Sequence, residues 1–346
     1  MTTTPRRTTV ADVAALAGTS TAVVSYVIND GPRPVAPATR AKVLSAIDTL
    51  GFRPSRGARA LRVQRSSFIG LVVPGTADPF YVQHSHAVEA AAGRRDHLTM
   101  SGNSGFDADQ EATLTAALID EGVDGMVILG VGGSQELSRV LDRSPVRRVF
   151  VHHRPHGVRG PLIRVDDRGW AARATAHLIG HGHARVALLT HLDDEGPVGQ
   201  RVEGWRDALV SAGLDPTDDL IVRSPIDRSS ASAAVEAWLS APDRANAVFA
   251  ATDELAFGLL HQAGRLGIRI PDELAVFSFD GVDAAAMTVP ELSTVREPFD
   301  EMGERAVQLL LDGEPGDASV LAGSAIEVKD CEMVYRTSCG CGVDGV

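Results

Sequence analysis

The first fifty residues contain three short stretches in which apolar positions recur at the three- and four-residue spacing of an amphipathic helix. The first begins at Thr9, which can cap it, and ends at Gly18; the second covers residues 21–28. The third begins with Pro37 in its first turn and can end at Gly51. Two short helices around a glycine-containing turn predict a helix-turn-helix. Spacing alone leaves a generic helical bundle open as the alternative.

From residue 68 onward, short apolar runs alternate with helical stretches. Buried strands are predicted for FIGLVVP, GMVILG, VRRVFVHH, RVALLTHL, NAVFAA and LAVFSFD, and helices over residues 112–121, 170–181, 202–212, 231–239 and 255–266. This alternation predicts parallel sheets with helices on both faces. Sheets of this kind bind ligands beyond the carboxyl ends of their strands.

Charge separates the two regions. Residues 1–66 carry a net charge of +7, which leaves −19 on the rest of a chain whose total is −12. This segment contains three aspartates and ten basic residues, which are Arg6, Arg7, Arg33, Arg40, Lys42, Arg53, Arg56, Arg59, Arg62 and Arg65. A basic arm on an acidic body is the pattern expected when one end of a protein meets a polyanion, although a solvated basic segment has the same composition.

Length and composition narrow the class of protein. The chain has 346 residues, of which 44% are hydrophobic, so two or three soluble domains are expected. It contains no run of 18 apolar residues, and no apolar run follows Arg6 and Arg7, so we expect neither a membrane partner nor a secretory signal. Only Cys331, Cys339 and Cys341 are cysteines, which is typical of a cytoplasmic protein without a disulfide framework.

Two segments of the head, TVADVAALAGTSTAVVSYVIN and VAPATRAKVLSAIDTLGFRPS, resemble the DNA-binding head of the lactose-repressor (LacI/GalR) family. The resemblance implies a small all-α helix-turn-helix domain over residues 1–54, whose second helix enters the major groove. By position, Thr21, Ala22 and Tyr26 would read bases. Other predicted DNA contacts, mainly to phosphates, are Thr9, Ser20, Ser25, Asn29 and Thr39.

The head departs from the family pattern at two positions. Tyr26 stands where many members have arginine, which can hold guanine with two hydrogen bonds, so a different base preference is expected there. Ala36 stands where a hydroxyl residue usually caps the third helix. Loss of such a cap costs about 1 kcal/mol, so the head is expected to be marginally stable.

Residues 55–66 resemble the hinge helix of the same family. The resemblance implies that two such helices pair across a homodimer in the minor groove, where Leu61, flanked by Ala58 and Arg59, wedges into a base step. A helix this short is unstable alone, so it would form only on DNA and could act as the switch element. A flexible basic linker is the alternative, and Gly57 favours it.

The core landmarks DPFY, VDGMVIL, HHRP, VDDRGWAA, GHARVALL, RVEGWRDAL, ATDELAFGLL, FSFDG and PELSTVREP also follow the family order. They imply two doubly wound parallel-sheet lobes of periplasmic-binding-protein type over residues 67–340, joined by three crossings. The first lobe would comprise about 67–165 and 296–322, and the second about 166–295 and 323–340. A small-molecule effector would bind between them.

The residues that match effector-binding positions in the family are Phe80, Arg154, Arg201, Asp253 and Asp280. An aromatic ring can cover an apolar sugar face, and charged groups bind hydroxyls strongly, so a carbohydrate effector is expected. A surface ion pair is the alternative for any single Arg or Asp. His153 replaces a common aspartate, and no aromatic residue lies near Ile226, so a galactoside is not indicated.

Other chemistries have weaker support. His177 and His181 lie four apart on a predicted helix, but the sequence offers no evident third ligand, and Cys339-Gly-Cys341 lacks the second pair of a zinc motif. We therefore expect no metal, no cofactor and an exposed C-terminal tail. The absence of a catalytic constellation argues against an enzyme, and the basic head argues against a solute-binding protein. The expected function is an effector-controlled regulator, most commonly a repressor, that binds a pseudo-palindromic operator as a homodimer.

Overall fold

The computed structural model describes residues 8–29, 33–53, 66–130, 135–312 and 326–341. The chain divides into two compact units, residues 1–66 and 67–346, which are described separately. The predicted hinge positions Ala58, Arg59 and Leu61 lie outside the described residues.

The N-terminal unit is the predicted three-helix head. Its helices are α1 (Val10–Ala17), α2 (Thr21–Asn29) and α3 (Pro37–Leu50). They surround a small apolar core that includes Val13, Val24, Val27, Val43 and Phe52. Gly18 and Gly51 both adopt the left-handed conformation that ends α1 and α3, as the sequence predicts.

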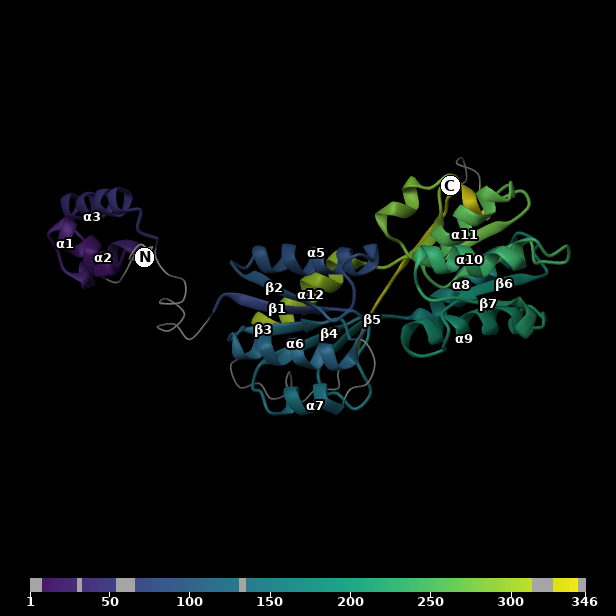
Figure 1. Ribbon diagram of the computed structural model, residues 1–346, viewed down its shortest axis with the longest axis horizontal. Coiled ribbons are helices and arrows are strands. Elements are labelled where there is room, and N and C mark those ends of the chain that lie inside the picture. Colours follow the sequence, from purple (N-terminus) through teal and green to yellow (C-terminus); the bar gives the residue numbers. More distant parts are fainter. Residues whose placement is uncertain (1–7, 30–32, 54–65, 131–134, 313–325, 342–346) are drawn as a thin grey trace, which may run out of the picture. The chain divides into compact units, whose positions relative to one another are not determined.

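The first lobe of the larger unit is a six-stranded parallel sheet in the order β11-β5-β4-β3-β1-β2. Figure 1 shows α5 and α12 on one face of this sheet and α6 and α7 on the other. The strands are β1 (Phe68–Val73), β2 (Leu98–Asn103), β3 (Gly125–Ile128), β4 (Arg147–Val151), β5 (Leu162–Val165) and β11 (Ile326–Lys329), and the helices are α5 (Pro79–Gly93), α6 (Ala108–Asp120), α7 (Gln135–Asp142) and α12 (Phe299–Leu311).

The second lobe has the sheet order β12-β10-β9-β8-β6-β7, parallel except for the antiparallel edge strand β12. Its helices pack as two pairs, α8 with α9 and α10 with α11. The strands are β6 (Val186–Thr190), β7 (Ile221–Arg223), β8 (Ala247–Ala250), β9 (Ala275–Asp280), β10 (Ser293–Arg296) and β12 (Glu332–Val334); the helices are α8 (Asp167–Gly180), α9 (Gly196–Ser211), α10 (Arg228–Leu239) and α11 (Asp253–Arg265), with 3-10 turns η1 (Asp218–Leu220), η2 (Asp283–Met287) and η3 (Thr337–Cys339).

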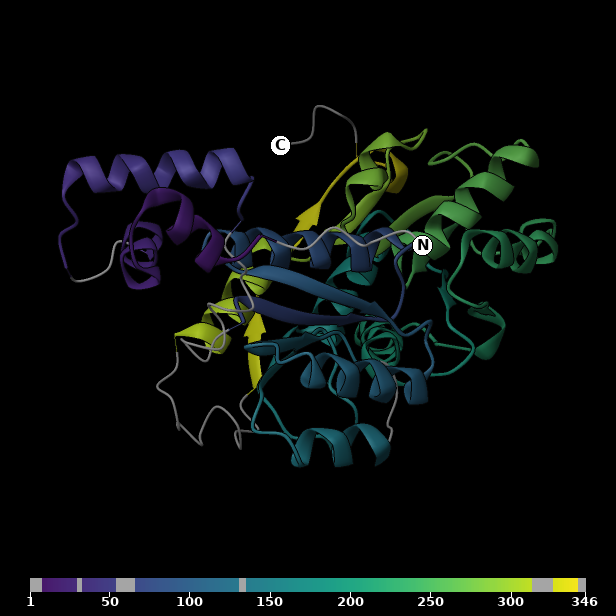
Figure 2. The same ribbon diagram turned by 60° about the vertical axis from the view of Figure 1, so that its left-hand side comes forward.

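The chain passes between the lobes three times: between β5 and α8, between β10 and α12, and between β11 and β12. In Figure 2 the two yellow strands β11 and β12 follow one another, one in each sheet. The predicted return to the second lobe at residue 323 is therefore wrong, because residues 326–329 pair with β5 in the first sheet. This edge strand, IEVK, alternates exposed and half-buried residues and has no continuous apolar run that would mark it in the sequence.

The C-terminal segment, predicted to be an exposed tail, folds onto the second lobe. Ser338 and Cys339 in η3 are both fully buried. The Ser338 hydroxyl donates to the carbonyl of Val276 and accepts from the backbone N–H of Ser293, which holds η3 against β9 and β10. The small polar residues of SCGC give no apolar pattern, and the hydrogen bonds that hold the segment are made to residues distant in the sequence. The sequence therefore gives no sign of this contact.

Among the described residues, no single helix is long and apolar enough to cross a membrane. The pair α1 and α2 meets the same length and composition test only when joined, and it bends by 104° at the break.

Candidate functional site

Arg201 on α9 is the centre of a buried charged network between the lobes. Its guanidinium is 1% exposed and donates from Nε to Asp167 Oδ1 at 2.9 Å. Nη1 donates to Asp280 Oδ1 at 2.7 Å, and Nη2 donates to Glu297 Oε1 at 3.1 Å. The three carboxylates come from the start of α8, the end of β9 and the crossing before α12. One side chain therefore joins the second lobe to two of the interlobe connections.

The Phe279 ring packs against one face of the Arg201 guanidinium. The Arg201 Cζ lies 3.7 Å from the centroid of the Phe279 ring, and Nη1 also donates to the carbonyl of Ala251 at 2.8 Å. Stacking on one face and hydrogen bonds along the edge leave the guanidinium little rotational freedom. Its orientation is thus set by the protein before any ligand arrives.

Asp253 at the start of α11 is buried beside this network, but its carboxylate faces protein donors. Its Oδ1 accepts from the hydroxyls of Ser278 at 2.5 Å and Thr294 at 2.8 Å, and its Oδ2 accepts from the Val282 N–H at 2.8 Å. The Asp253 N–H in turn donates to Asp280 Oδ2 at 3.2 Å. Asp253 therefore positions Asp280 and the ends of β9 and β10.

Asp280 ends β9 in an unusual backbone conformation, with φ of 113°, followed by Gly281 at φ 76°. A Cβ on Gly281 would lie 2.3 Å from the Cα of Arg296, so only glycine fits. This close approach of β9 and β10 turns the Asp280 carboxylate toward Arg201.

Phe80 in the first turn of α5 joins the network through two histidines. Its ring lies edge-on to His84 and His152, with centroids 4.7 Å away in each case, and to Phe299 at 5.7 Å. Glu297 lies 3.6 Å from His84 Nε2 and 3.8 Å from His152 Nδ1. Phe80 is only 5% exposed, so in this conformation it packs against these rings.

Acidic groups outnumber the buried cation. Four carboxylates (Asp167, Asp253, Asp280 and Glu297) gather around Arg201. Burial raises the pKa of Asp167 to about 7 and raises the pKa of Asp280, although Arg201 opposes both shifts. Burial and the charge of Arg201 lower the pKa of His152, which is therefore neutral at physiological pH. The network is rich in hydrogen-bond acceptors.

Several buried polar atoms of this network make no hydrogen bond within the described part of the chain. They are Asp167 Oδ2, Glu297 Oε2, both ring nitrogens of His84, His152 Nδ1 and Arg164 Nε. Burying a polar group without a partner costs about 1–3 kcal/mol, so a site with several such atoms has capacity for a polar ligand or water.

Arg154, the fifth predicted effector residue, is not brought into this network. It follows β4, and its Nη1 donates to the carbonyl of Gly160. The neighbouring His153 instead faces the other lobe, where a Cβ on Gly196 at the start of α9 would lie 3.6 Å from its ring. Arg164 Nη1 also spans the lobes, donating to Gln200 Oε1 at 3.0 Å.

Asp167, Glu297, His84 and His152 are site residues that were not singled out in the sequence. Asp167, His152 and Glu297 lie within the landmarks VDDRGWAA, HHRP and VREP, at the ends of strands or at crossings. The first three could have been found as polar residues at the carboxyl ends of predicted parallel strands, where such sheets bind ligands. His84 lies on an otherwise apolar helix face, and nothing in the sequence marks it as a site residue.

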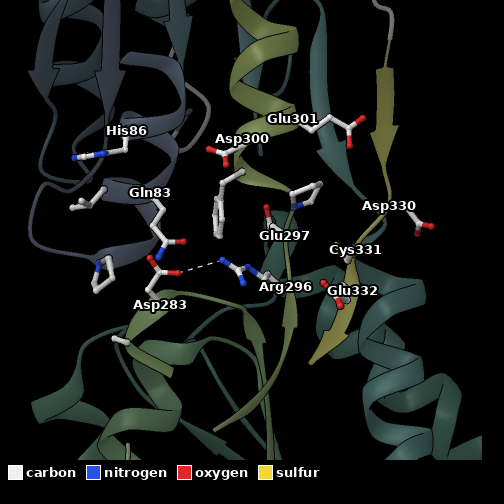
Figure 3. Close-up of a pocket in the computed structure, with 15 residues that line it drawn as sticks. Gln83, His86, Asp283, Arg296, Glu297, Asp300, Glu301, Asp330, Cys331 and Glu332 are labelled. Carbon is white, nitrogen blue, oxygen red and sulfur yellow. Dashed lines mark hydrogen bonds and ion pairs between the residues drawn. The ribbon is translucent and has the colours of Figure 1, made fainter. Parts of the chain in front are cut away.

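A cavity of about 890 Å³ opens beside the network and is lined by α5, η2, the start of α12 and the crossing between β11 and β12 (Figure 3). Gln83 and His86 line it from α5, and the Arg296–Asp283 ion pair, 3.3 Å long, lies opposite. It touches the buried network at Glu297, and none of the five predicted effector residues lines it. This cavity is therefore distinct from the surroundings of Arg201.

In the head, the predicted base-reading residues lie on one side of α2. Thr21 and Ala22 are exposed in its first turn, and Tyr26 is half-buried one turn later. Asn29 donates from Nδ2 to the carbonyl and hydroxyl of Ser25, so these two side chains stabilise each other.

The remaining predicted contacts lie at helix starts. Ser20 Oγ accepts from the Val23 N–H, while Thr9 forms a reciprocal capping box with Asp12. Thr39 is half-buried in the first turns of α3. As predicted, Ala36 leaves the start of α3 without a side-chain cap.

Comparison with known proteins agrees with this architecture. Residues 9–55 match the family of bacterial regulatory proteins of the lacI type, and residues 175–339 match a periplasmic binding protein-like domain. The chain is 31% identical over 318 residues to the catabolite control protein A of Priestia megaterium, covering 90% of this chain and 95% of that protein. It is 32% identical over 304 residues to the ribose operon repressor of Escherichia coli K12, covering 88% and 92%.

Solved structures are similar as well. A complex of the transcriptional regulator CelR with cellobiose has a TM-score of 0.68 at 30% identity and covers 96% of this chain and 100% of its own. The lac repressor dimer bound to operator and an anti-inducer has a TM-score of 0.81 at 22% identity, with coverage of 96% and 99%, which shows the shared fold. The chain belongs to the lacI family of bacterial regulatory proteins, and it is a DNA-binding transcriptional regulator rather than an enzyme.

Proposed function

We propose that this regulator is a homodimeric repressor that binds a pseudo-palindromic operator, and that a small polyhydroxylated molecule of the carbohydrate class, bound between the lobes, controls its operator affinity. It acts at the chromosome in the cytoplasm. The observation that carries the proposal is the buried network of Arg201, Asp167, Asp280 and Glu297 between the lobes.

The charge of this network favours a ligand rich in hydrogen-bond donors. Three carboxylates contact one guanidinium, a fourth (Asp253) lies behind Asp280, and burial already raises the pKa of Asp167 and Asp280. A further anion would add to the repulsion, whereas sugar hydroxyls would donate to Asp167 Oδ2 and Glu297 Oε2, which accept no hydrogen bond within the described residues. The cellobiose complex of the related CelR is consistent with this ligand class.

Control of DNA binding follows from the position of the network. Arg201 and Asp280 belong to the second lobe, whereas Glu297 lies where the chain crosses to the first. A ligand that exchanges hydrogen bonds with these groups stabilises one arrangement of the lobes over another. The difference in its affinity for the two arrangements is the free energy available to change operator affinity.

Dimerisation is supported by large apolar side chains that are exposed on α5 and near η2. Val82 on α5 is 40% exposed, Met287 at the end of η2 is 83% exposed, and Val289 shortly after it is 97% exposed. Exposed apolar side chains of this size are typical of a protein–protein interface. We assign these residues to the contact with a second copy of the chain.

Arg201→Lys tests the effector site. It keeps the buried charge but removes the planar set of hydrogen-bond donors. We therefore expect the apparent effector affinity, measured by thermal shift, to fall tenfold or more, while selective DNA binding persists. The screen uses a panel of sugars and nucleobases. Arg206→Lys on the same helix, a half-buried arginine paired with Glu203, is the matched control and should respond like the unmodified protein.

The DNA-binding proposal is tested separately by selection from random duplexes at a fixed salt concentration. We expect a two-fold symmetric motif and a strong decrease in affinity with rising salt. Failure to select any motif, with or without metabolites, contradicts the proposal.

A further inference from the structure

Two histidines and two cysteines that lie about 160 residues apart in the chain meet at the second lobe. His177 Nε2 lies 3.4 Å from Cys339 Sγ and 3.5 Å from Cys341 Sγ. His181 Nε2 lies 3.5 Å from Cys341 Sγ. The ligand atoms of His177 and the two cysteines all lie within 4.8 Å of one another. Folding thus supplies the second pair of ligands that neither sequence motif contains alone.

These separations suit a tetrahedral metal centre. Zinc binds thiolate sulfur at about 2.3 Å and imidazole nitrogen at about 2.0–2.1 Å, so a tetrahedral site places sulfur and nitrogen ligands about 3.5 Å apart. The three printed sulfur–nitrogen distances of 3.4, 3.5 and 3.5 Å agree with that value. Three of the four ligand atoms therefore lie close to their places in such a centre, and the His181 ring, which contacts Cys341, would shift to complete it.

The fold holds each pair of ligands independently. His177 and His181 are four residues apart at the end of α8, so both rings lie on the same face, with centroids 4.6 Å apart. Cys339 is buried in η3, which Ser338 fixes to β9 and β10. Gly340 has φ of 92°, a conformation that favours glycine and turns Cys341 back toward α8.

The surroundings of His177 resemble those of a structural site. The rings of Tyr335 and Phe277 lie 4.8 Å and 5.4 Å from the His177 ring, and Cys339 is inaccessible to solvent. Apolar rings around ligands restrict water and hold their orientation. The carboxyl end of α8 also favours a cation there, because the helix dipole is negative at that end.

The protonation states of His177 and Cys341 are compatible with a metal ion taking the place of protons. Burial and the neighbouring His181 lower the pKa of His177 to about 4, so its ring is neutral at pH 7. Burial and the hydrogen bond to Cys339 raise the pKa of Cys341 to about 11, so this thiol keeps its proton until a metal displaces it.

We propose that His177, His181, Cys339 and Cys341 bind one Zn²⁺ ion in a closed tetrahedral site that fastens the C-terminal segment to α8. Four protein ligands leave no open position for catalysis. Mixed nitrogen and sulfur donors suit zinc, whereas magnesium and calcium prefer oxygen ligands. None of its four ligands is a predicted DNA-binding or effector-binding residue.

Metal content of the full-length protein tests this site. Protein purified in reductant, loaded with Zn²⁺ and dialysed should retain one zinc per chain by elemental analysis. Cys341→Ser and His181→Ala, both at accessible side chains, should weaken zinc binding by more than about 100-fold, beyond the 10–100-fold typical of losing an outer-shell partner. Cys331→Ser and His183→Ala are the matched controls, since Cys331 lies between β11 and β12 and His183 contacts Asn246. Both controls should retain one zinc.

Cobalt substitution reports the ligand set directly. Co²⁺-loaded protein should show visible bands of tetrahedral cobalt with a thiolate charge-transfer band that decreases in Cys341→Ser. Zinc should also raise the Tm of the unmodified chain but leave the Tm of Cys341→Ser and His181→Ala unchanged. The proposal is overturned if the unmodified protein retains no zinc, if Cys341→Ser and His181→Ala retain it as tightly, or if cobalt shows only octahedral, thiolate-free bands.

Discussion

Arg201 on α9 and Glu297 in the β10–α12 crossing form a buried ion pair, 3.1 Å from Nη2 to Oε1, although they are 96 residues apart in the chain. Glu297 also lies within 3.6 Å of His84 Nε2 on α5. One carboxylate therefore contacts groups from both lobes at the point where the chain passes between them. A ligand that competes for this carboxylate would alter the interlobe connection itself.

Glu297→Ala should destabilise the core. It leaves the buried Nη2 of Arg201 without its acceptor, which costs about 1–3 kcal/mol, while Asp167 and Asp280 still balance the charge of Arg201. Asp207→Ala is the control, because its bidentate pair with Arg168 is exposed and should contribute about 1 kcal/mol or less. Urea unfolding of the full chain measures both. Equal losses in the two variants would contradict the central position given to Glu297.

Asp167→Asn should change how stability depends on pH. The pKa of Asp167 is raised to about 7 in the folded protein from an ordinary value near 4, so its favourable contribution is complete below pH 4 and is lost as pH rises through 7. Asparagine can still accept from Arg201 Nε but does not titrate. The variant should therefore gain stability relative to the unmodified protein between pH 5 and pH 8, with a slope of at most about 1.4 kcal/mol per pH unit.

The measurement for Asp167→Asn is the midpoint of urea unfolding at several pH values. Asp207→Asn serves as control, because Arg168 lowers the pKa of Asp207 and it stays ionised throughout this range. A constant difference between Asp167→Asn and the unmodified protein from pH 5 to pH 8 would show that Asp167 does not titrate there.

The alternation of apolar runs and helical stretches was sufficient to predict the class of fold, because buried parallel strands such as β1, β3 and β8 are continuously apolar. Helix starts were predicted too late. The helix expected from residue 112 begins at Ala108, where the Asp107 side chain accepts from two backbone N–H groups. The first turn of such a helix is polar, so a search for recurring apolar residues does not detect it, although capping residues such as Asp107 can be recognised in the sequence.

Site residues could be predicted from the sequence only where they lie at the ends of regular strands or on helices. Arg201 and Asp280 were expected and meet, but Arg154 bonds to a local carbonyl in a loop whose shape no periodicity encodes. Edge strands such as β11 and the docking of η3 depend on tertiary hydrogen bonds. For the same reason, the approach of Cys341 to His181 could not be inferred from spacing along the chain.

Tyr26→Arg should change base preference in the operator. Tyr26 lies on α2 one turn after the exposed residues Thr21 and Ala22, and arginine can donate two hydrogen bonds to guanine. Selection from random duplexes should show guanine enriched at one symmetric pair of positions, with a discrimination of about 1–3 kcal/mol. Ala15→Arg, at an exposed position of α1, adds the same charge and should raise affinity without altering the motif. Identical motifs for both variants would contradict base reading at position 26.

Leu61→Ala tests the wedge that the family resemblance implies for the hinge segment. Loss of an inserted side chain should reduce DNA bending and weaken operator binding, since the unstacked step costs a few kcal/mol that added contacts offset. Gel mobility of circularly permuted operator fragments measures the bend, and thermal shift confirms that effector binding is unchanged. Leu44→Ala on α3, 47% exposed, is the control. A bend of the same size in Leu61→Ala contradicts the wedge.

Ala36→Ser should stabilise the head by supplying the missing cap. Ala36 has φ −54° and ψ 137°, outside the helical region, and its side chain makes no capping hydrogen bond to the first turn of α3. A serine hydroxyl there can accept from the N–H of Thr39 and should contribute about 1 kcal/mol, which slows amide exchange in α3 about fivefold. Ala41→Ser, exposed within α3, introduces the same hydroxyl where serine is a weaker helix former than alanine, so exchange should be unchanged or faster. Hydrogen exchange of the full chain separates the two, and equal rates in both variants would mean that the start of α3 does not limit the stability of the head.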